Sequence, residues 1–135
     1  MTAVALAETD GNPATNTVAG WQVPGFPTPP VPDYPSAHSA AGSAAAAIIE
    51  DLVPGRGRSI TTTSGSLPGV MRTFATVDAA AKENALSRIY IGFHFREATT
   101  VGLTQGRQVG DYVAQNAMRP LKGNNWEIVI TTVDR

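Results

Sequence analysis

The stretch from Glu97 to Met118, EATTVGLTQGRQVGDYVAQNAM, sets the fold expected for this chain of 135 residues. It carries Gly102, Gly106 and Gly110, which recur every four residues and therefore lie on one face of an α-helix. Because glycine has no side chain beyond hydrogen, such a face lets a second helix approach closely. Pro120 cannot continue the helix. The stretch therefore predicts a helix from about 97 to 118 with a closely packed partner.

Two further stretches predict helices. The segment from Ala37 to Val53 is dominated by alanine, the best helix former, and Ser36 before it is a natural N-cap. A second helix is expected from about Val77 to Ile91, with Thr76 as its cap, because apolar residues recur there at helical spacing. Three helices with small-residue faces predict an all-α fold, a helical bundle.

The remaining segments have other compositions. Six of the ten prolines lie between Pro24 and Pro35, which predicts an extended strap laid over the domain. Residues 56–69 are rich in Gly, Ser and Thr and are expected to form a loop. Alternating apolar and polar residues predict a short strand-like tail within 125–135. The organisation expected is a single partial domain over 1–135, with a strap over 1–35, a helical core over 36–120 and a tail over 121–135.

Composition excludes several classes of function. Hydrophobic residues make up 42% and charged residues 16%, which argues against a disordered chain. The net charge of −1 provides no basic field for nucleic acid or an anionic membrane. No apolar run is long enough to span a bilayer, and the first residues lack the positive region of a signal peptide. A soluble chain without cysteine chemistry is expected, and the compartment is unknown.

The chain has two histidines, and each has a suggestive setting. His38 stands at the opening of the alanine-rich helix, and His94 follows Arg88 by six residues. On one continuous helix Arg88 and His94 would point in different directions, at about 100° per residue. They converge only if the helix ends near Gly92 and the chain turns, which a glycine makes easy.

These groups together describe an oxyanion site. Helix N-termini present unpaired N–H groups, Arg88 can bind an oxyanion through two nitrogens, and Ser36 and the N–H of Ala37 are neutral donors. One histidine can bind the central atom, while the other moves a proton near neutral pH. The alternatives are that each histidine is a helix cap or a surface residue and that the arginine forms a structural ion pair.

Two short motifs resemble those of a known superfamily. Pro35–His38, PSAH, resembles the Pro-Ser-Gly-His motif of the type 2 phosphatidic acid phosphatase and vanadium-dependent haloperoxidase superfamily. Ser87–His94, SRIYIGFH, is similar to its last motif, Ser-Arg-x5-His. Flanking segments such as Thr28–Tyr34 resemble the soluble bacterial haloperoxidase-like branch more than membrane lipid phosphatases. The resemblance extends from about Thr9 to Pro120.

The resemblance implies a helical bundle that holds vanadate or phosphate. It implies that His94 is the ligand of vanadium, or the nucleophile that becomes phosphohistidine, and that His38 is the acid–base residue. Arg88 would bind the oxyanion oxygens, assisted by Ser36 and the amide of Ala37. The activity implied first is oxidation of halide by hydrogen peroxide. The alternatives are hydrolysis of a phosphate ester and a non-catalytic remnant or interaction module.

Three departures from the superfamily pattern matter. The motif Lys-x6-Arg-Pro is absent, which predicts a chain truncated at its N-terminus just after that motif. Apolar faces left without their helices would then favour a homodimer or aggregation. Ala37 stands where the motif has glycine, and its N–H is retained. Phosphatases often place a carboxylate four residues after the last histidine, but this chain has Ala98, so another acceptor must orient His94.

Overall fold

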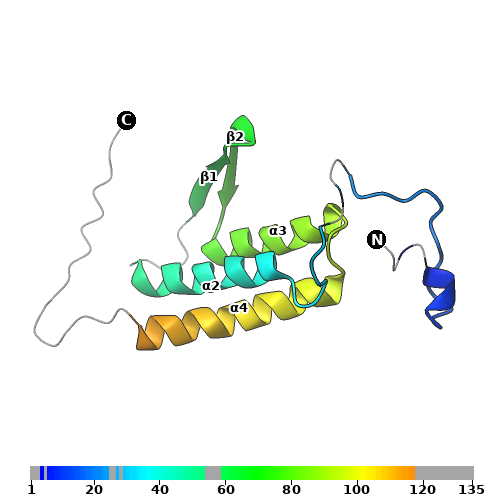
Figure 1. The fold of residues 1–135 in the computed structure, drawn as a ribbon. Helices are drawn as coiled ribbons and strands as arrows, with labels where there is room; N and C mark the ends of the chain where they lie inside the picture. The colour runs from blue at the N-terminus through cyan, green and yellow to red at the C-terminus, as the bar shows by residue number, and fades with distance from the viewer. Residues whose placement is uncertain (1–3, 5, 25–26, 28, 54–58, 118–135) are drawn as a thin grey trace, which may run out of the picture.

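The structure is a computed structural model that describes residues 4, 6–24, 27, 29–53 and 59–117. Three long helices lie side by side, a two-stranded hairpin projects from one side of them, and a short 3-10 helix lies apart near the N-terminus (Figure 1). The elements in chain order are η1 (Ala7–Thr9), α2 (Ala37–Leu52), β1 (Ile60–Ser64), β2 (Leu67–Phe74), α3 (Val77–Tyr90) and α4 (Arg96–Asn116). The three predicted helices are confirmed, with ends within two residues of those expected.

The predicted helix caps are also confirmed. The Oγ of Ser36 accepts from the backbone N–H of Ser39 at 3.4 Å at the start of α2. The Oγ1 of Thr76 accepts from the N–H of Ala79 at 3.0 Å at the start of α3. These bonds satisfy N–H groups that have no acceptor within their own helix.

The glycine face of α4 packs directly on the backbone of α2. A Cβ added at Gly102 would lie 2.6 Å from the carbonyl oxygen of Ser36, and one added at Gly106 would meet the carbonyl of Ala40. The third glycine of the stripe meets α2 in the same way. Since the neighbours are backbone atoms, the contact leaves no room for a side chain. The predicted close approach of two helices is confirmed.

The core of the bundle is built from small side chains. The buried residues of the three helices include Ser39, Ser43, Ala46, Ala47, Ala81, Ala85, Ala98 and Thr99. Helices with such small side chains approach closely but enclose little apolar volume.

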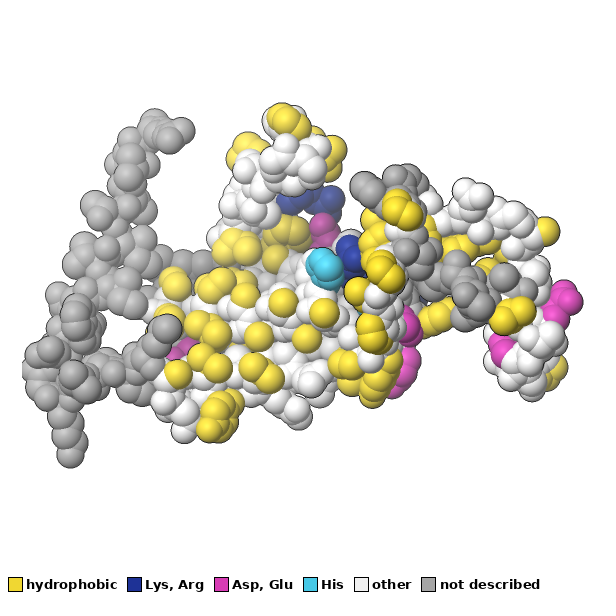
Figure 2. Space-filling view, viewed as in Figure 1, with side chains coloured by type: hydrophobic (Ala, Val, Ile, Leu, Met, Phe, Trp, Pro, Cys, Tyr) yellow, Lys and Arg dark blue, Asp and Glu magenta, His cyan; other side chains and the backbone are white. Residues whose placement is uncertain are grey.

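Large apolar side chains consequently remain exposed, among them Ile49, Leu52, Val109 and Tyr112. Figure 2 shows apolar side chains distributed over one face of the molecule. The expected homodimer stays a prediction.

The hairpin corrects the expected fold class. Strands β1 and β2 pair antiparallel, from Ile60 opposite Phe74 to Thr63 opposite Met71. The all-α prediction, and the loop expected over residues 56–69, are therefore wrong where these strands form. Threonine runs carry little hydrophobic signal, yet their β-branched side chains favour extended backbone. The strand-like tail expected within 125–135 lies outside the described residues.

No helix among the described residues has the length and hydropathy needed to cross a membrane.

Candidate oxyanion site

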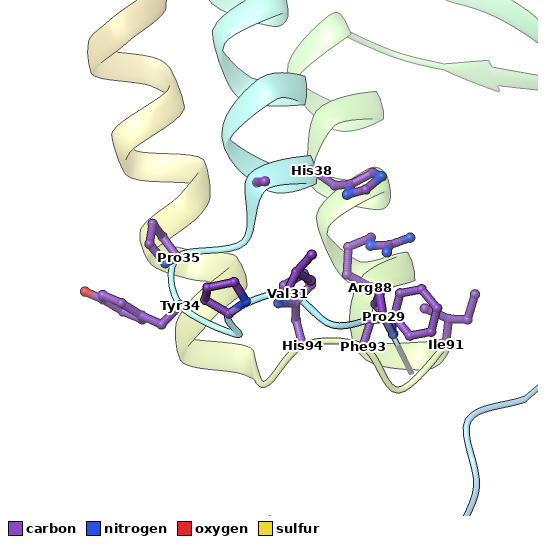
Figure 3. Close-up of a pocket in the computed structure, with 11 residues that line it drawn as sticks. Pro29, Val31, Tyr34, Pro35, His38, Arg88, Ile91, Phe93 and His94 are labelled. Carbon is purple, nitrogen blue, oxygen red and sulfur yellow. The ribbon is translucent and has the colours of Figure 1, made fainter. Parts of the chain in front are cut away.

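A cavity of about 730 Å³ lies where the proline-rich strap crosses the ends of α2 and α3 (Figure 3). It brings His38, from the start of α2, together with Arg88 and His94, which lie about 50 residues later in the chain. Ala37 also lines it. The rest of the wall is apolar or aromatic and consists of Pro29, Val31, Pro32, Tyr34, Pro35, Ile91 and Phe93. The predicted meeting of two imidazoles and one guanidinium around a common cavity is present in the structure.

A tight turn after α3 carries the chain from Arg88 to His94. Gly92 has φ of 76°, a conformation that residues with a side chain rarely adopt. The N–H groups of Phe93 and His94 both donate to the carbonyl of Arg88, at 3.0 and 3.2 Å. The helix therefore ends where the sequence predicted, and the turn places both side chains on the same cavity.

Asp33 orients the ring of His94. The Nδ1 of His94 lies 2.7 Å from the carbonyl oxygen of Asp33 and 3.1 Å from its Oδ1. Because a carbonyl oxygen can only accept, Nδ1 carries a proton, and Nε2 is the unprotonated nitrogen of the neutral ring. The same Oδ1 accepts from the N–H of Phe95 at 3.1 Å. Asp33 thus fixes both the ring and the start of α4.

Sequence reasoning missed Asp33. The absence of a carboxylate at Ala98 indicated that another acceptor was needed, but nothing in the motifs pointed to the strap. In the structure Ala98 is only 1% exposed, and its carbonyl accepts from the N–H of Ser36 at 2.9 Å. The strap supplies the acceptor from a site 61 residues earlier in the chain.

Arg88 holds an unsatisfied donor at the cavity. Its Nε is buried and has no hydrogen-bond partner among the described residues. The guanidinium carbon lies 4.8 Å from the centroid of the Phe93 ring, so the ring supports one face of the cation. A buried charged donor without a partner is costly, and an anion in the cavity would satisfy it. This orphaned nitrogen is the strongest structural sign of an oxyanion site.

His38 faces the cavity from the first turn of α2. Partial burial lowers the pKa of His38, and electrostatic interactions with Arg88 and with the neighbouring imidazole of His94 lower it further. The ring is therefore neutral at neutral pH and ready to take up a proton. The carbonyl of His38 accepts from the Nδ2 of Asn84 at 2.8 Å, which links α2 to α3 beside the site.

Ala37 and Ser36 have different positions relative to the cavity. Ala37 is the first residue of α2, so its N–H has no acceptor within the helix. Ser36 is fully buried and is not among the residues that line the cavity. Its Oγ accepts from the hydroxyl of Ser39 at 2.9 Å. The role of Ser36 as a donor to the anion stays a prediction.

Comparison with known proteins assigns the chain to a class. The family model described as the VCPO second helical-bundle domain matches residues 3–123. The chain therefore belongs to this family, within the vanadium haloperoxidase-like superfamily.

A solved structure with a similar fold is a bacterial vanadium-dependent iodoperoxidase. It shares 36% identity with a TM-score of 0.61, over 67% of this chain and 22% of that protein. This chain thus spans about a fifth of that relative. A search of curated proteins gave no match.

The residues present fit a vanadate ion. Within the described part of the chain, no group of three or more His, Asp or Glu side chains is placed to hold a metal cation. An oxyanion such as vanadate needs a different set of groups from a metal cation: one nitrogen that binds the central atom and several hydrogen-bond donors for its oxygens. His94 offers Nε2, Arg88 offers its unpaired Nε, and the N-terminus of α2 offers the N–H of Ala37.

Proposed function

We propose that this chain carries the vanadate site of a haloperoxidase that oxidises halide with hydrogen peroxide. The observation that carries the proposal is the common cavity of His38, Arg88 and His94, with the Nε of Arg88 buried and unpartnered. Family membership supports the proposal.

Each residue has a definite part in binding the anion. Nε2 of His94 would bind the central atom, and Asp33 keeps the proton on Nδ1 so that Nε2 stays available. Arg88 donates from its free Nε to the oxyanion oxygens, and Ala37 adds its N–H. Ser36 is the further donor predicted from the motif. Vanadate, when bound, supplies the centre at which hydrogen peroxide is activated toward halide.

His38 handles the proton of the reaction. Oxidation of a halide ion by hydrogen peroxide consumes one proton and yields hypohalous acid and water. With its lowered pKa, His38 is neutral in the resting site and can accept a proton as peroxide enters. It can return that proton to the departing oxygen. The negative charge of the anion stabilises the protonated ring between these two events.

Hydrolysis of phosphate monoesters is the second candidate, and the contact of Asp33 with His94 favours it. A carboxylate on Nδ1 makes Nε2 a better nucleophile, and Asp33 supplies one where the motif position holds Ala98. Nε2 would attack phosphorus, His38 would protonate the leaving alkoxide, and water would then release phosphate from phosphohistidine. The same pocket serves both reactions because vanadate and phosphate share charge and shape.

The affinity of the isolated chain for vanadate is expected to be modest. The superfamily motif Lys-x6-Arg-Pro is absent from the sequence, which removes two charged donors. Each charge-assisted bond contributes about 1.5–3 kcal/mol, so losing both costs about 3–6 kcal/mol, or two to four decades in affinity. Calorimetric titration with orthovanadate measures this affinity. Sub-micromolar binding would show that the estimated loss from the two missing charged donors is wrong.

A paired activity assay tests the proposal. Bromide- and iodide-dependent halogenation is measured with vanadate and peroxide, beside hydrolysis of nitrophenyl phosphate. The proposal predicts halogenation that disappears in His94→Ala and persists in Tyr112→Ala, which changes an exposed residue away from the cavity. Hydrolysis alone would support the phosphatase. Loss of both activities with helical circular dichroism retained would support a non-catalytic module.

A further inference from the structure

Arg88 is held in place differently from two other arginines of the bundle and hairpin. Arg72 and Arg107 each form an ion pair with a glutamate, at 2.6 and 2.7 Å. Among the described residues, no carboxylate lies within ion-pair distance of Arg88. Its guanidinium carbon lies instead 4.8 Å from the centroid of the Phe93 ring. The support of this cation is therefore aromatic rather than acidic.

A ring and a carboxylate leave a guanidinium in different states. A carboxylate cancels the positive charge and accepts from the N–H groups, so that neither is available to a second anion. The face of an aromatic ring attracts the cation but carries no net charge and no oxygen to accept those bonds. Arg88 consequently keeps its charge, and its buried Nε keeps a free N–H.

The turn that builds the candidate site also places this ring. With Gly92 at a φ of 76°, the N–H groups of Phe93 and His94 both donate to the carbonyl of Arg88. One turn therefore brings the ligating histidine and the aromatic ring back to the same arginine, and Figure 3 shows that ring beside the guanidinium.

We propose that Phe93 is a positioning residue, whose ring holds the guanidinium of Arg88 so that Nε stays free to donate to an oxyanion in the cavity. The inference rests on the proposed function, because it takes Arg88 to be a donor to that anion. The ring acts through Arg88, and its contribution is the orientation and the availability of that donor.

Two variants of Phe93 separate the aromatic face from apolar bulk. Phe93→Leu keeps an apolar side chain but removes the ring, whereas Phe93→Tyr keeps a ring face. Calorimetric titration with orthovanadate is expected to show binding about threefold to tenfold weaker in Phe93→Leu, the size of a partly desolvated cation–π contact. Phe93→Tyr should stay within about twofold of the parent chain.

The hairpin offers a matched control. The ring of Phe74 lies 5.9 Å from the guanidinium carbon of Arg72, and neither residue lines the cavity. Phe74→Leu thus removes the same kind of contact elsewhere in the chain. It should leave the dissociation constant for orthovanadate unchanged.

NMR of the arginine Nε–H groups tests the contact without any anion. A proton held over an aromatic face is shifted to lower frequency by the ring current. The Nε–H signal of Arg88 should show this shift in the parent chain and in Phe93→Tyr, and lose it in Phe93→Leu. An unshifted signal in the parent chain would overturn the inference without the need for a variant.

The outcomes separate this inference from the proposed function. If Phe93→Leu binds orthovanadate as tightly as the parent chain, the positioning role is overturned and the oxyanion site stands. A loss that Phe93→Tyr shares would also overturn the inference, because bulk or packing would then explain it. If the parent chain binds no orthovanadate while the Arg88 signal is shifted, the proposed function fails and the inference fails with it.

Discussion

Gly102→Ala links the packing of the bundle to the candidate site. The added Cβ would lie 2.6 Å from the carbonyl oxygen of Ser36 and 2.9 Å from the Cβ of Ser39, whereas ordinary contact begins at 3.4 Å. The start of α2 must therefore move about 0.8 Å away from α4. Ala37 and His38, which line the cavity, lie in the first turn of that helix. One methyl group should thus disturb both stability and anion binding.

The magnitude follows from two opposing effects. Overpacking against atoms that cannot yield costs about 1–3 kcal/mol, at the upper end here because one neighbour of Gly102 is backbone. Replacing glycine by alanine inside a helix gains about 1 kcal/mol. We expect a net loss of about 2 kcal/mol, or a fall in Tm of about 6–10 °C by thermal unfolding. A Tm that rises, as helix propensity alone predicts, would refute the close contact.

Gly42→Ala is the matched control within α2. Its added Cβ would lie 2.7 Å from the Nδ2 of Asn84, the far end of a side chain that can rotate away. Rotation gives up the bond from Asn84 to the carbonyl of His38, a loss of about 1 kcal/mol that offsets the helix-propensity gain. The Tm of Gly42→Ala should therefore stay within about 3 °C of the parent chain.

Three further outcomes are expected. Because folding lowers the pKa of His38, the unfolded chain binds more protons than the folded chain once the pH falls below about 6.5. The free energy of unfolding should therefore decrease as the pH falls through this range, and it should decrease less steeply in His38→Gln. Asp33→Ala should lower the free energy of unfolding, measured in urea, by about 1–2 kcal/mol. Nitrogen NMR should still find the proton on Nδ1 of His94, because the backbone carbonyl of residue 33 remains as its acceptor. Loss of that tautomer would contradict the geometry. Arg72→Ala should shift stability by less than about 1 kcal/mol, since its 2.6 Å ion pair with Glu83 is exposed.

The helices could be predicted from local physical chemistry, whereas the meeting of His38, Arg88 and His94 was expected from the resemblance of two motifs to a superfamily. Alanine content, the caps Ser36 and Thr76, and the glycine spacing of α4 act within one or two turns, so the sequence displays them directly. The turn at Gly92 needed a positive φ that glycine adopts readily. The sequence therefore allowed Arg88 and His94 to converge, on the condition that the helix ended near Gly92.

The hairpin and Asp33 could not be predicted in this way. Strand β1 is an exposed run dominated by threonine, so its pairing with β2 leaves no alternation of buried and exposed residues to detect. The contact of Asp33 with His94 joins residues 61 positions apart, and it exists because the strap crosses the end of the bundle. Such contacts depend on tertiary packing, which motif spacing does not encode.

The central claim is that both histidines surround one anion beside Arg88. Since the chain contains two histidines, nitrogen NMR of its imidazoles during an orthovanadate titration observes both sides of the proposed site. The account predicts that the signals of His38 and His94 move together along one binding curve with a single equivalent of vanadate. Signals that respond at different concentrations, or a His94 signal that does not move, would contradict it.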